Sequence, residues 1–272
     1  MIGKSYIMIK NGLSNRRGGT TMKSGDRQIQ ILEAMKETHS ISVNELLEML
    51  PASPATIRRD ITALEQAGKI RKARGRIFLE DIRKAPSYEM RDAMHDEEKK
   101  RIGKAAAALV REDDSIIIDA GTTTLALAEN LRDRSHLSVI TNSIPVAYTF
   151  NATNVNVFMC GGMLEDMALV DDDAVAFFAS HQVEKAFIGA SGVRGITGLT
   201  VVSPFQFAVK RQMVRSAREV YALLDESKFH IMGVNLFADF RELTGIITSK
   251  PITNERLLER LEQEHVKVIY TE

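Results

Sequence analysis

The chain carries at residues 50–61 the run LPASPATIRRDI, which decides how its first part folds. A short turn leads into a helix, for which Ser53 is the expected N-cap and Pro54 the first helical residue. Pro54 lacks the N–H that a helix start leaves unpaired anyway, and its φ is already helical. Ile57 and Ile61 recur at helical spacing, which predicts one buried face.

Polar and basic side chains occupy the other side of this helix. Thr56, Arg58 and Arg59 fall in its first two turns, where a recognition helix presents side chains to a DNA groove. These three and Ser53 are the expected DNA-binding residues of this segment. Two helices are expected before it, one over residues 28–36 with Ile29 and Met35 on its apolar face, and one over residues 43–50 capped by Ser42. This is the order of a helix-turn-helix.

A basic hairpin is expected after the third helix. Two short strand-like pieces flank Arg74 and Gly75, which predicts a wing on which Arg71, Lys72, Arg74 and Arg76 hold phosphates. Residues 58–76 hold seven basic and two acidic side chains, a net charge of +5. A solvated basic helix and hairpin without a ligand remains the alternative.

The charge of the whole chain hides this segment, because 36 basic side chains balance 36 acidic ones. Residues 1–22 carry +4, residues 23–84 carry +3 and residues 85–272 carry −7. A basic front and an acidic back indicate domains with different tasks. We expect a disordered extension over 1–22 with Met22 as the biological start, a winged helix-turn-helix over 23–80, a linker over 81–95 and an effector-sensing domain over 96–272.

Several protein classes are excluded by composition. The single cysteine, Cys160, allows no internal disulfide framework, and its place after a strand that we expect to be buried favours a packing role. The six histidines lack metal-ligand spacing, and no serine-hydrolase elbow occurs. No apolar run approaches the ~18 residues of a membrane span. We therefore expect a cytoplasmic protein with no metal, cofactor, membrane contact or catalytic residue.

From residue 96 onward, apolar strands alternate with helical patterns. The expected strands are 115–119, 137–141, 155–159, 185–189, 220–224, 243–248 and 266–270. The expected helices are 96–110, 122–131, 144–150, 173–181, 204–218 and 254–264. Such alternation predicts an α/β domain with a largely parallel sheet covered by helices on both faces.

The run from Asp119 to Thr124 is the strongest candidate ligand site in this domain. It places a glycine turn and three threonines between a strand and a helix start, where backbone N–H groups and the helix dipole favour a phosphate. The spacing is not that of a P-loop, and a helix merely capped by Thr122 is the alternative. Residues 141–143, 161–162 and 191–192 follow strands in the same manner. Lys210 and Lys228 either neutralise an anion or lie on a solvated face.

These motifs together resemble those of the DeoR family of bacterial transcriptional regulators, over about residues 26–270. The motifs that carry the resemblance are SPATIRRDI at 53–61, Leu64, Gly68, DAGTTT at 119–124, TNS at 141–143, Gly161-Gly162, FIGASGV at 187–193, GLT at 198–200, Val209-Lys210 and Lys228-Phe229. The resemblance implies a winged helix-turn-helix joined to a domain similar to ribose-5-phosphate isomerase and CoA transferases.

The resemblance also implies a function. Family members are usually repressors of sugar-catabolism operons that bind double-stranded operator DNA, are released by a phosphorylated sugar metabolite and form dimers or tetramers. Carried onto this chain, the effector-binding residues would be Asp119, Gly121, Thr122, Thr123, Thr124, Asn142, Gly162, Ser191, Gly192, Lys210 and Lys228.

The chain departs from the family pattern at several of these places. Acids at Glu165 and Asp166 stand where an arginine is common, residues 169–173 lack the usual glycine, Gln206-Phe207 replaces a glutamate-alanine pair, and Ser249 replaces an aspartate. Acids near the pocket would oppose a multiply charged phosphate. Two rival functions stay open: a sugar-phosphate isomerase with a DNA-binding domain, using Asp119 and Lys210, and an architectural protein without a ligand.

Overall fold

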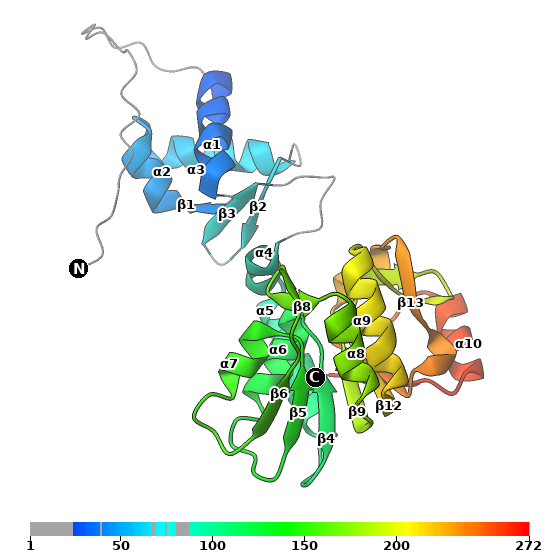
Figure 1. The fold of residues 1–272 in the computed structure, drawn as a ribbon. Coiled ribbons are helices and arrows are strands. Elements are labelled where there is room, and N and C mark those ends of the chain that lie inside the picture. The colour runs from blue at the N-terminus through cyan, green and yellow to red at the C-terminus, as the bar shows by residue number, and fades with distance from the viewer. Residues whose placement is uncertain (1–23, 39, 67–68, 74, 80–86, 272) are drawn as a thin grey trace, which may run out of the picture. The chain divides into compact units, whose positions relative to one another are not determined.

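The computed structural model describes residues 24–38, 40–66, 69–73, 75–79 and 87–271. The chain divides between Glu80 and Asp81 into two compact units, named here the N-terminal unit and the C-terminal unit (Figure 1). The predicted extension over 1–22, the expected start at Met22 and the wing residue Arg74 lie outside the described residues.

The N-terminal unit contains three helices and a three-stranded antiparallel sheet in the order β1-β3-β2. Its elements are α1 (Ser24–Thr38), β1 (Ser40–Ser42), α2 (Val43–Met49), α3 (Pro54–Gln66), β2 (Ile70–Ala73) and β3 (Arg76–Leu79). The predicted second and third helices and the hairpin are confirmed. Strand β1 was not predicted; it is three residues long and pairs Ile41 with Ile77 of β3.

Local chemistry explains where α2 begins. Ser42 Oγ accepts a hydrogen bond from the Glu45 N–H at 3.1 Å, and the Ser42 N–H donates to Glu45 Oε2 at 2.7 Å, which is a complete capping box. The first helix begins at Ser24, earlier than expected, and buries Ile31 and Met35, which are four residues apart. Ile29, expected on the apolar face, is 58% exposed, so that assignment was wrong.

A buried ion pair ties the first helix to the third. Arg27 Nε donates to the carboxylate of Asp60, and the two residues are 7% and 1% exposed. Around them the apolar side chains form one core. Its fully or almost fully buried members are Ile31, Met35, Ile41, Leu46, Leu50, Ile57, Ile61, Leu64, Ile70 and Ile77.

The C-terminal unit is built on a seven-stranded sheet in the order β15-β14-β12-β9-β4-β5-β6, with every neighbouring pair parallel. Its strands are β4 (Ser115–Ile118), β5 (Ser138–Thr141), β6 (Asn156–Met159), β9 (Val183–Ile188), β12 (Ala217–Leu224), β14 (Gly245–Thr248) and β15 (Lys267–Tyr270). These are the seven predicted strands, with ends that differ by up to three residues. The predicted α/β class is confirmed.

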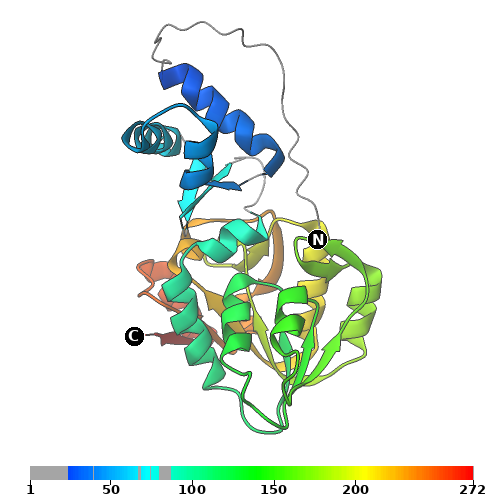
Figure 2. The same cartoon turned by 90° about the vertical axis from the view of Figure 1, so that its left-hand side faces the viewer.

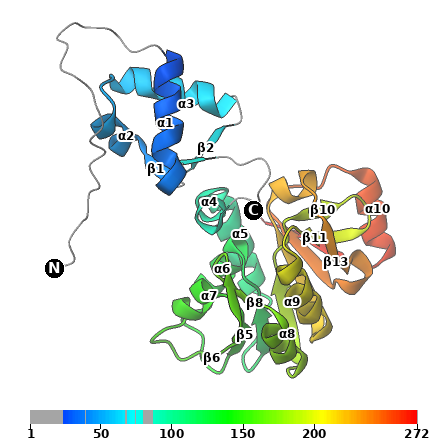
Figure 3. The same ribbon diagram turned by 45° about the horizontal axis from the view of Figure 1, so that its top comes forward.

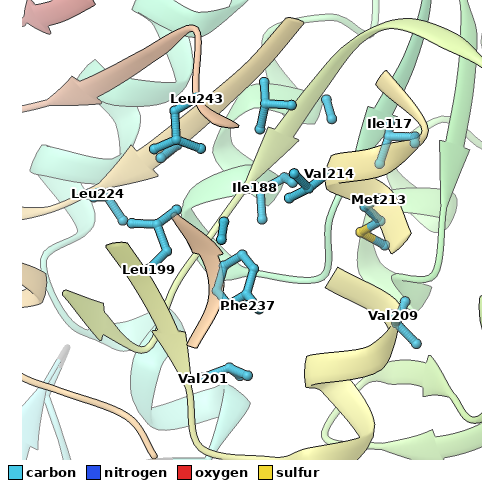
Figure 4. Packing of buried hydrophobic residues seen from close by; sticks show 14 of the residues in the cluster. Ile117, Ile188, Leu199, Val201, Val209, Met213, Val214, Leu224, Phe237 and Leu243 are labelled. Carbon is cyan, nitrogen blue, oxygen red and sulfur yellow. The ribbon is translucent and has the colours of Figure 1, made fainter. Parts of the chain in front are cut away.

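Helices cover both faces of this sheet (Figures 1 and 2). One face carries α5 (Asp96–Ala107), α6 (Thr122–Glu129) and α7 (Ile144–Thr149), and the other carries α8 (Asp172–Ala179), α9 (Pro204–Arg215) and α10 (Glu255–Gln263). Alternate residues of the central strands supply the two cores: Ile116 and Ile118 face one, and Ile117 faces the other. Figure 4 shows Val209 and Met213 of α9 in the second core.

A small antiparallel sheet and a hairpin complete the C-terminal unit. Strands β10 (Gly192–Arg194), β11 (Gly198–Val201) and β13 (Asn235–Asp239) form the sheet (Figure 3), and β7 (Met163–Glu165) pairs with β8 (Ala168–Val170). Two short 3-10 helices, η1 (Glu226–His230) and η2 (Phe240–Glu242), flank β13. None of these was predicted, because they are three to five residues long and lack a clear period.

Two predictions need correction. The expected linker over 81–95 contains a helix, α4 (Tyr88–Ala93), whose N-cap Ser87 accepts from the Met90 N–H at 3.3 Å. Strand β6 is an edge strand with Phe158 49% exposed, so it is not a buried strand. Cys160 itself is buried, and desolvation raises the pKa of its thiol to about 11, which fits packing. No helix in the described ranges has the length and apolar character needed to cross a membrane.

The Arg27–Asp60 pair generates a stability prediction. Replacing Asp60 by Ala leaves the Arg27 guanidinium buried without its carboxylate, which should cost about 3–5 kcal/mol and unfold much of the N-terminal unit. Urea denaturation followed by circular dichroism would measure this loss. Arg59→Ala, an exposed change on the same helix, should stay within about 0.5 kcal/mol of wild type. Equal stability of the two variants would contradict the assignment.

Candidate functional site

The start of α3 is organised by two hydroxyl groups. Ser53 Oγ accepts from the Thr56 N–H at 3.2 Å and lies 2.8 Å from Thr56 Oγ1. The predicted N-cap is therefore confirmed. Because the two side chains bond each other, they also fix the orientation of the first helical turn.

The two arginines of α3 lie on its exposed side. Ile57 and Ile61, on the opposite side, are 0% and 2% exposed. Within the described part of the chain, the guanidinium groups of Arg58 and Arg59 form no hydrogen bond or ion pair. Helix α3 therefore presents two uncompensated cations, which suits an anionic partner.

The wing places its cations beside carboxylates. Lys72 Nζ lies 2.7 Å from Glu65 Oε2, and Arg76 lies 3.9 Å from Glu45 Oε2. Both pairs are exposed, and exposed pairs of this kind contribute only about 0–1 kcal/mol. A phosphate can therefore compete for these cations at small cost. Arg71 is half-buried.

The strand order reverses between β4 and β9. From β4 the chain continues outward to β5 and β6, whereas from β9 it continues to β12, β14 and β15 on the other side. In open parallel sheets this switch point, beyond the carboxyl ends of the strands, is where ligands bind. Asp119 follows β4 there, and Gly189 follows β9.

A buried ion pair spans the switch point. Asp119 Oδ2 accepts from the Gly189 N–H at 2.9 Å and from Lys210 Nζ, and Lys210 Nζ also donates to the Gly189 carbonyl at 3.1 Å. Asp119 is 1% and Lys210 5% exposed. Lys210 is thus not a solvated helix lysine. Three segments far apart in the sequence meet at one carboxylate.

The threonines at the start of α6 are buried but have different roles. Thr124 Oγ1 donates to the carbonyls of Asp119 at 2.6 Å and Gly121 at 2.8 Å, so this hydroxyl holds the turn. The N-cap is Gly121, which has no side chain, and the alternative in which Thr122 caps the helix is therefore wrong. The first-turn N–H groups of an α-helix have no intrahelical acceptor. They leave an anion-attracting end next to Asp119.

Asn142, at the end of β5, carries an unpaired acceptor. Its side-chain Nδ2 donates to the Leu169 carbonyl at 3.0 Å, and the backbone carbonyl of Asn142 accepts from the Leu169 N–H at 2.8 Å. Its Oδ1 is buried and has no partner among the described residues. A buried acceptor without a donor is costly, so a ligand hydroxyl would stabilise it.

The predicted glycines have packing reasons for their identity. A Cβ on Gly162, where φ is +129°, would lie 2.5 Å from the Val170 carbonyl oxygen. A Cβ on Gly192 would lie 1.9 Å from the Ile231 carbonyl oxygen. Both positions require a bare backbone whether or not a ligand binds.

The remaining predicted residues lie near other partners. Ser191 is half-buried, and its N–H donates to the Thr200 carbonyl at 2.9 Å. Lys228 lies on η1, with Nζ 3.8 Å from Asp225 Oδ2. Across the described residues, no hydrogen bond or ion pair joins Lys228 to Asp119 or Lys210.

Three of the acids that depart from the family pattern in this region, Glu165, Asp166 and Asp171, accept hydrogen bonds from nearby donors. Glu165 Oε2 accepts from Ser203 Oγ at 2.7 Å. Asp166 accepts from the Tyr88 N–H at 2.8 Å and from Arg91 at 2.7 Å. Asp171 caps α8 and accepts from the Met163 N–H at 2.7 Å. The expected repulsion of a phosphate is therefore reduced by local pairing.

No metal centre is found in the part of the chain that the structure describes.

Two family models match the sequence: the DeoR-like helix-turn-helix domain over residues 27–82 and the DeoR C-terminal sensor domain over residues 94–250. This chain belongs to the DeoR family. It is a DNA-binding transcriptional regulator with a C-terminal sensor domain, as the sequence motifs predicted.

Relatives in the DeoR family match over most of the chain. The HTH-type transcriptional repressor GlcR of Bacillus subtilis is 31% identical, covering 92% of this chain and 98% of its own length. The regulator IolR of the same organism is 30% identical over 84% of this chain and 92% of its own length. The glycerol-3-phosphate regulon repressor of Escherichia coli is 29% identical, with coverages of 76% and 84%.

Solved structures give only distant likenesses. Ribose 5-phosphate isomerase A from Methanocaldococcus jannaschii aligns with a TM-score of 0.36 and 19% identity, over 48% of this chain and 53% of that one. The sorbitol operon regulator SorC from Klebsiella pneumoniae aligns with a TM-score of 0.34 and 12% identity, over 90% and 96%. The α/β class of this DeoR-family chain rests on its own sheet topology.

Sequence reasoning missed the contacts between distant segments. Asp166 and Arg91 are 75 positions apart, and no local pattern links them. Asp171 was identifiable as an N-cap, because it precedes a helical pattern and acids favour that position. The same applies to Ser203, which precedes Pro204 at the start of α9.

The Asp119–Lys210 pair generates the second prediction. Lys210→Met removes the ammonium and leaves a buried carboxylate, which should destabilise the C-terminal unit by about 3–5 kcal/mol. The double variant Lys210→Met/Asp119→Asn removes both charges and should recover most of that loss. Chemical denaturation of the single and double variants measures the coupling. Additive effects would show that the two side chains do not stabilise each other.

Proposed function

We propose that this chain is a repressor of a carbohydrate-catabolism operon and that a phosphorylated sugar metabolite releases it from its operator. The observation that carries the proposal is the exposed Arg58–Arg59 couple on α3, whose guanidinium groups have no partner among the described residues. The same chain builds a polar site at a sheet switch point. The names of the relatives support it, since they include repressors and a glycerol-3-phosphate regulon repressor.

In this proposal α3 enters the major groove. Thr56, Arg58 and Arg59 contact the DNA, with Ser53 holding the first turn, and Arg71, Lys72, Arg74 and Arg76 contact phosphates. The weak carboxylate pairs of Lys72 and Arg76 exchange for phosphate contacts when DNA binds. The protein acts in the cytoplasm, where bacterial operators lie, and as a dimer or tetramer whose N-terminal units engage half-sites together.

The effector occupies the carboxyl edge of the sheet. The first-turn N–H groups of α6 and the hydroxyls of Thr122 and Thr123 receive the phosphate, and Asn142 Oδ1 accepts from a sugar hydroxyl. The other effector-binding residues line this site, with Lys228 at its edge. They are Asp119, Gly121, Thr124, Gly162, Ser191, Gly192 and Lys210.

The rival isomerase function is not favoured by any observation. Enediolate chemistry needs a carboxylate that can take a proton from the substrate carbon. The Asp119 carboxylate is instead bonded to the Lys210 ammonium and the Gly189 N–H in a buried position. We therefore propose a binding site without turnover, and the relatives are named as regulators.

The role of Arg58 can be measured on the operator. If Arg58 contacts a base, Arg58→Ala should weaken specific binding by about 1–3 kcal/mol and relax preference at one operator position. Fluorescence anisotropy with operator variants, at fixed salt, measures both effects. Glu48→Ala, another exposed change in the N-terminal unit, is the control. A uniform loss across all DNA sequences would assign Arg58 to the phosphate backbone.

The sensing function is tested by ligand screening. Glycerol 3-phosphate, glucose 6-phosphate and fructose 1-phosphate would be compared with their unphosphorylated forms in thermal shift and operator-release assays. A ligand at 100 times its Kd should stabilise the folded protein by about 2.7 kcal/mol. We expect at least one phosphate to raise Tm and to weaken operator binding. Turnover of the sugar phosphate would instead support the isomerase, and no shift with any probe would count against the sensor.

A further inference from the structure

The hairpin β7–β8 is hydrogen-bonded to the segment that follows β5. Leu169 exchanges two hydrogen bonds with Asn142, at 2.8 and 3.0 Å, and Met167 O accepts from the Ile144 N–H at 3.1 Å. Ser143 and Ala168 form an isolated antiparallel bridge. Strand β8 is therefore attached along residues 142–144, at the edge of the sheet where the effector site is proposed.

The base and the first strand of the hairpin are attached to α8 and α9. The Asp171 carboxylate accepts from the Met163 N–H at 2.7 Å and from the Asp173 N–H at 3.0 Å, which joins the hairpin base to the start of α8. Glu165 accepts from Ser203, the N-cap of α9. Because α9 also carries Lys210, the hairpin is connected to both sides of the switch point.

The tip of the hairpin binds α4. Asp166 Oδ1 accepts from the Tyr88 N–H at 2.8 Å, and Asp166 Oδ2 accepts from Arg91 at 2.7 Å. Lys99 Nζ donates to the Arg91 carbonyl and so holds the other end of α4 against α5. In the sequence, α4 begins at Tyr88, eight positions after the boundary between the two units at Glu80.

The turn at the tip is held in a conformation that its residues do not favour. Asp166 and Met167 have φ values of 50° and 67°, and turns of this kind normally use Asn-Gly or Asp-Gly. A methionine at positive φ persists only when surrounding contacts enforce it. The contacts of Asp166 with α4 and of Met167 O with Ile144 supply that constraint, so loss of either favours another turn geometry.

We propose that the β7–β8 hairpin transmits the state of the effector site to α4, with Asp166 as the positioning residue. The identity of the signal rests on the function proposed above, whereas the mechanical coupling does not. A ligand that bonds Asn142 Oδ1 shifts the Asn142–Leu169 pairing, and the hairpin moves with it because its strands are hydrogen-bonded to each other. The Asp166 contacts with α4 then change, and α4 lies shortly after the point in the chain where the DNA-binding unit ends.

Hydrogen exchange on the full chain tests the coupling without any ligand. Asp166→Ala should speed exchange of the amides of residues 87–95 at least tenfold, because the Tyr88 N–H and Arg91 lose their acceptor. Asn142→Asp keeps the side-chain volume, removes the Nδ2 donor, and should speed exchange in 167–170 and also in 87–95. Asp173 is an exposed acid seven residues from Asp166. Asp173→Ala is therefore the matched control, and amide exchange in residues 87–95 should stay as in wild type.

Two results would overturn the proposal. In the first, Asn142→Asp speeds exchange only next to its own position and leaves α4 as in wild type. In the second, Asp173→Ala loosens α4 as much as Asp166→Ala, which would make the effect one of charge alone. Exchange that rises in α4 for both Asn142→Asp and Asp166→Ala, with no further rise in the double variant, supports one shared path.

Operator binding with glycerol 3-phosphate, or whichever tested sugar phosphate gives the largest thermal shift, supplies the functional readout. Asp166→Ala should keep the thermal shift but reduce the ligand-induced change in operator Kd from tenfold or more to less than threefold. A full wild-type response in this variant would overturn the coupling. If no phosphate probe acts on wild type, the proposed effector class fails, and the exchange experiment still decides the coupling.

Discussion

The architecture of the C-terminal unit depends on one buried ion pair at the point where its strand order reverses. Asp119 follows β4, Gly189 follows β9, and Lys210 lies on α9, yet all three meet at a single carboxylate oxygen. Burial makes each charge dependent on the other, because an unpaired charge in this place would be costly. The pair therefore holds three segments in register and leaves the start of α6 beside them for a ligand.

A second buried pair has the same effect in the N-terminal unit. Arg27 and Asp60 join α1 to α3, so the helix that bears Arg58 and Arg59 has a fixed orientation within its unit. The exposed arginines and the hidden aspartate are neighbours in the sequence but have opposite tasks. The Asp60 carboxylate is buried and paired inside the fold, whereas Arg58 and Arg59 are exposed and can bind an anionic partner.

The acids at 165–171 show how tertiary contacts change the meaning of a residue. From the sequence alone, these acids are expected to repel a phosphate, and a cation is common at this place in the family. In the fold Glu165, Asp166 and Asp171 each accept hydrogen bonds from named donors. The same contacts join the hairpin to α4, α8 and α9, so these acids act as connectors within the C-terminal unit.

The sequence by itself determined the helix-turn-helix, the wing and the seven parallel strands, because these depend on local capping and on periodic apolar residues. Ser42, Ser53 and Pro54 indicated helix starts, and the apolar strands between 115 and 270 predicted the sheet. Only the tertiary structure decided the burial of Lys210, the exposure of Ile29, the helix inside the predicted linker and the Asp166–Arg91 contact. These four features depend on contacts with residues far away in the sequence. Local sequence patterns do not indicate which distant segments become neighbours in the fold.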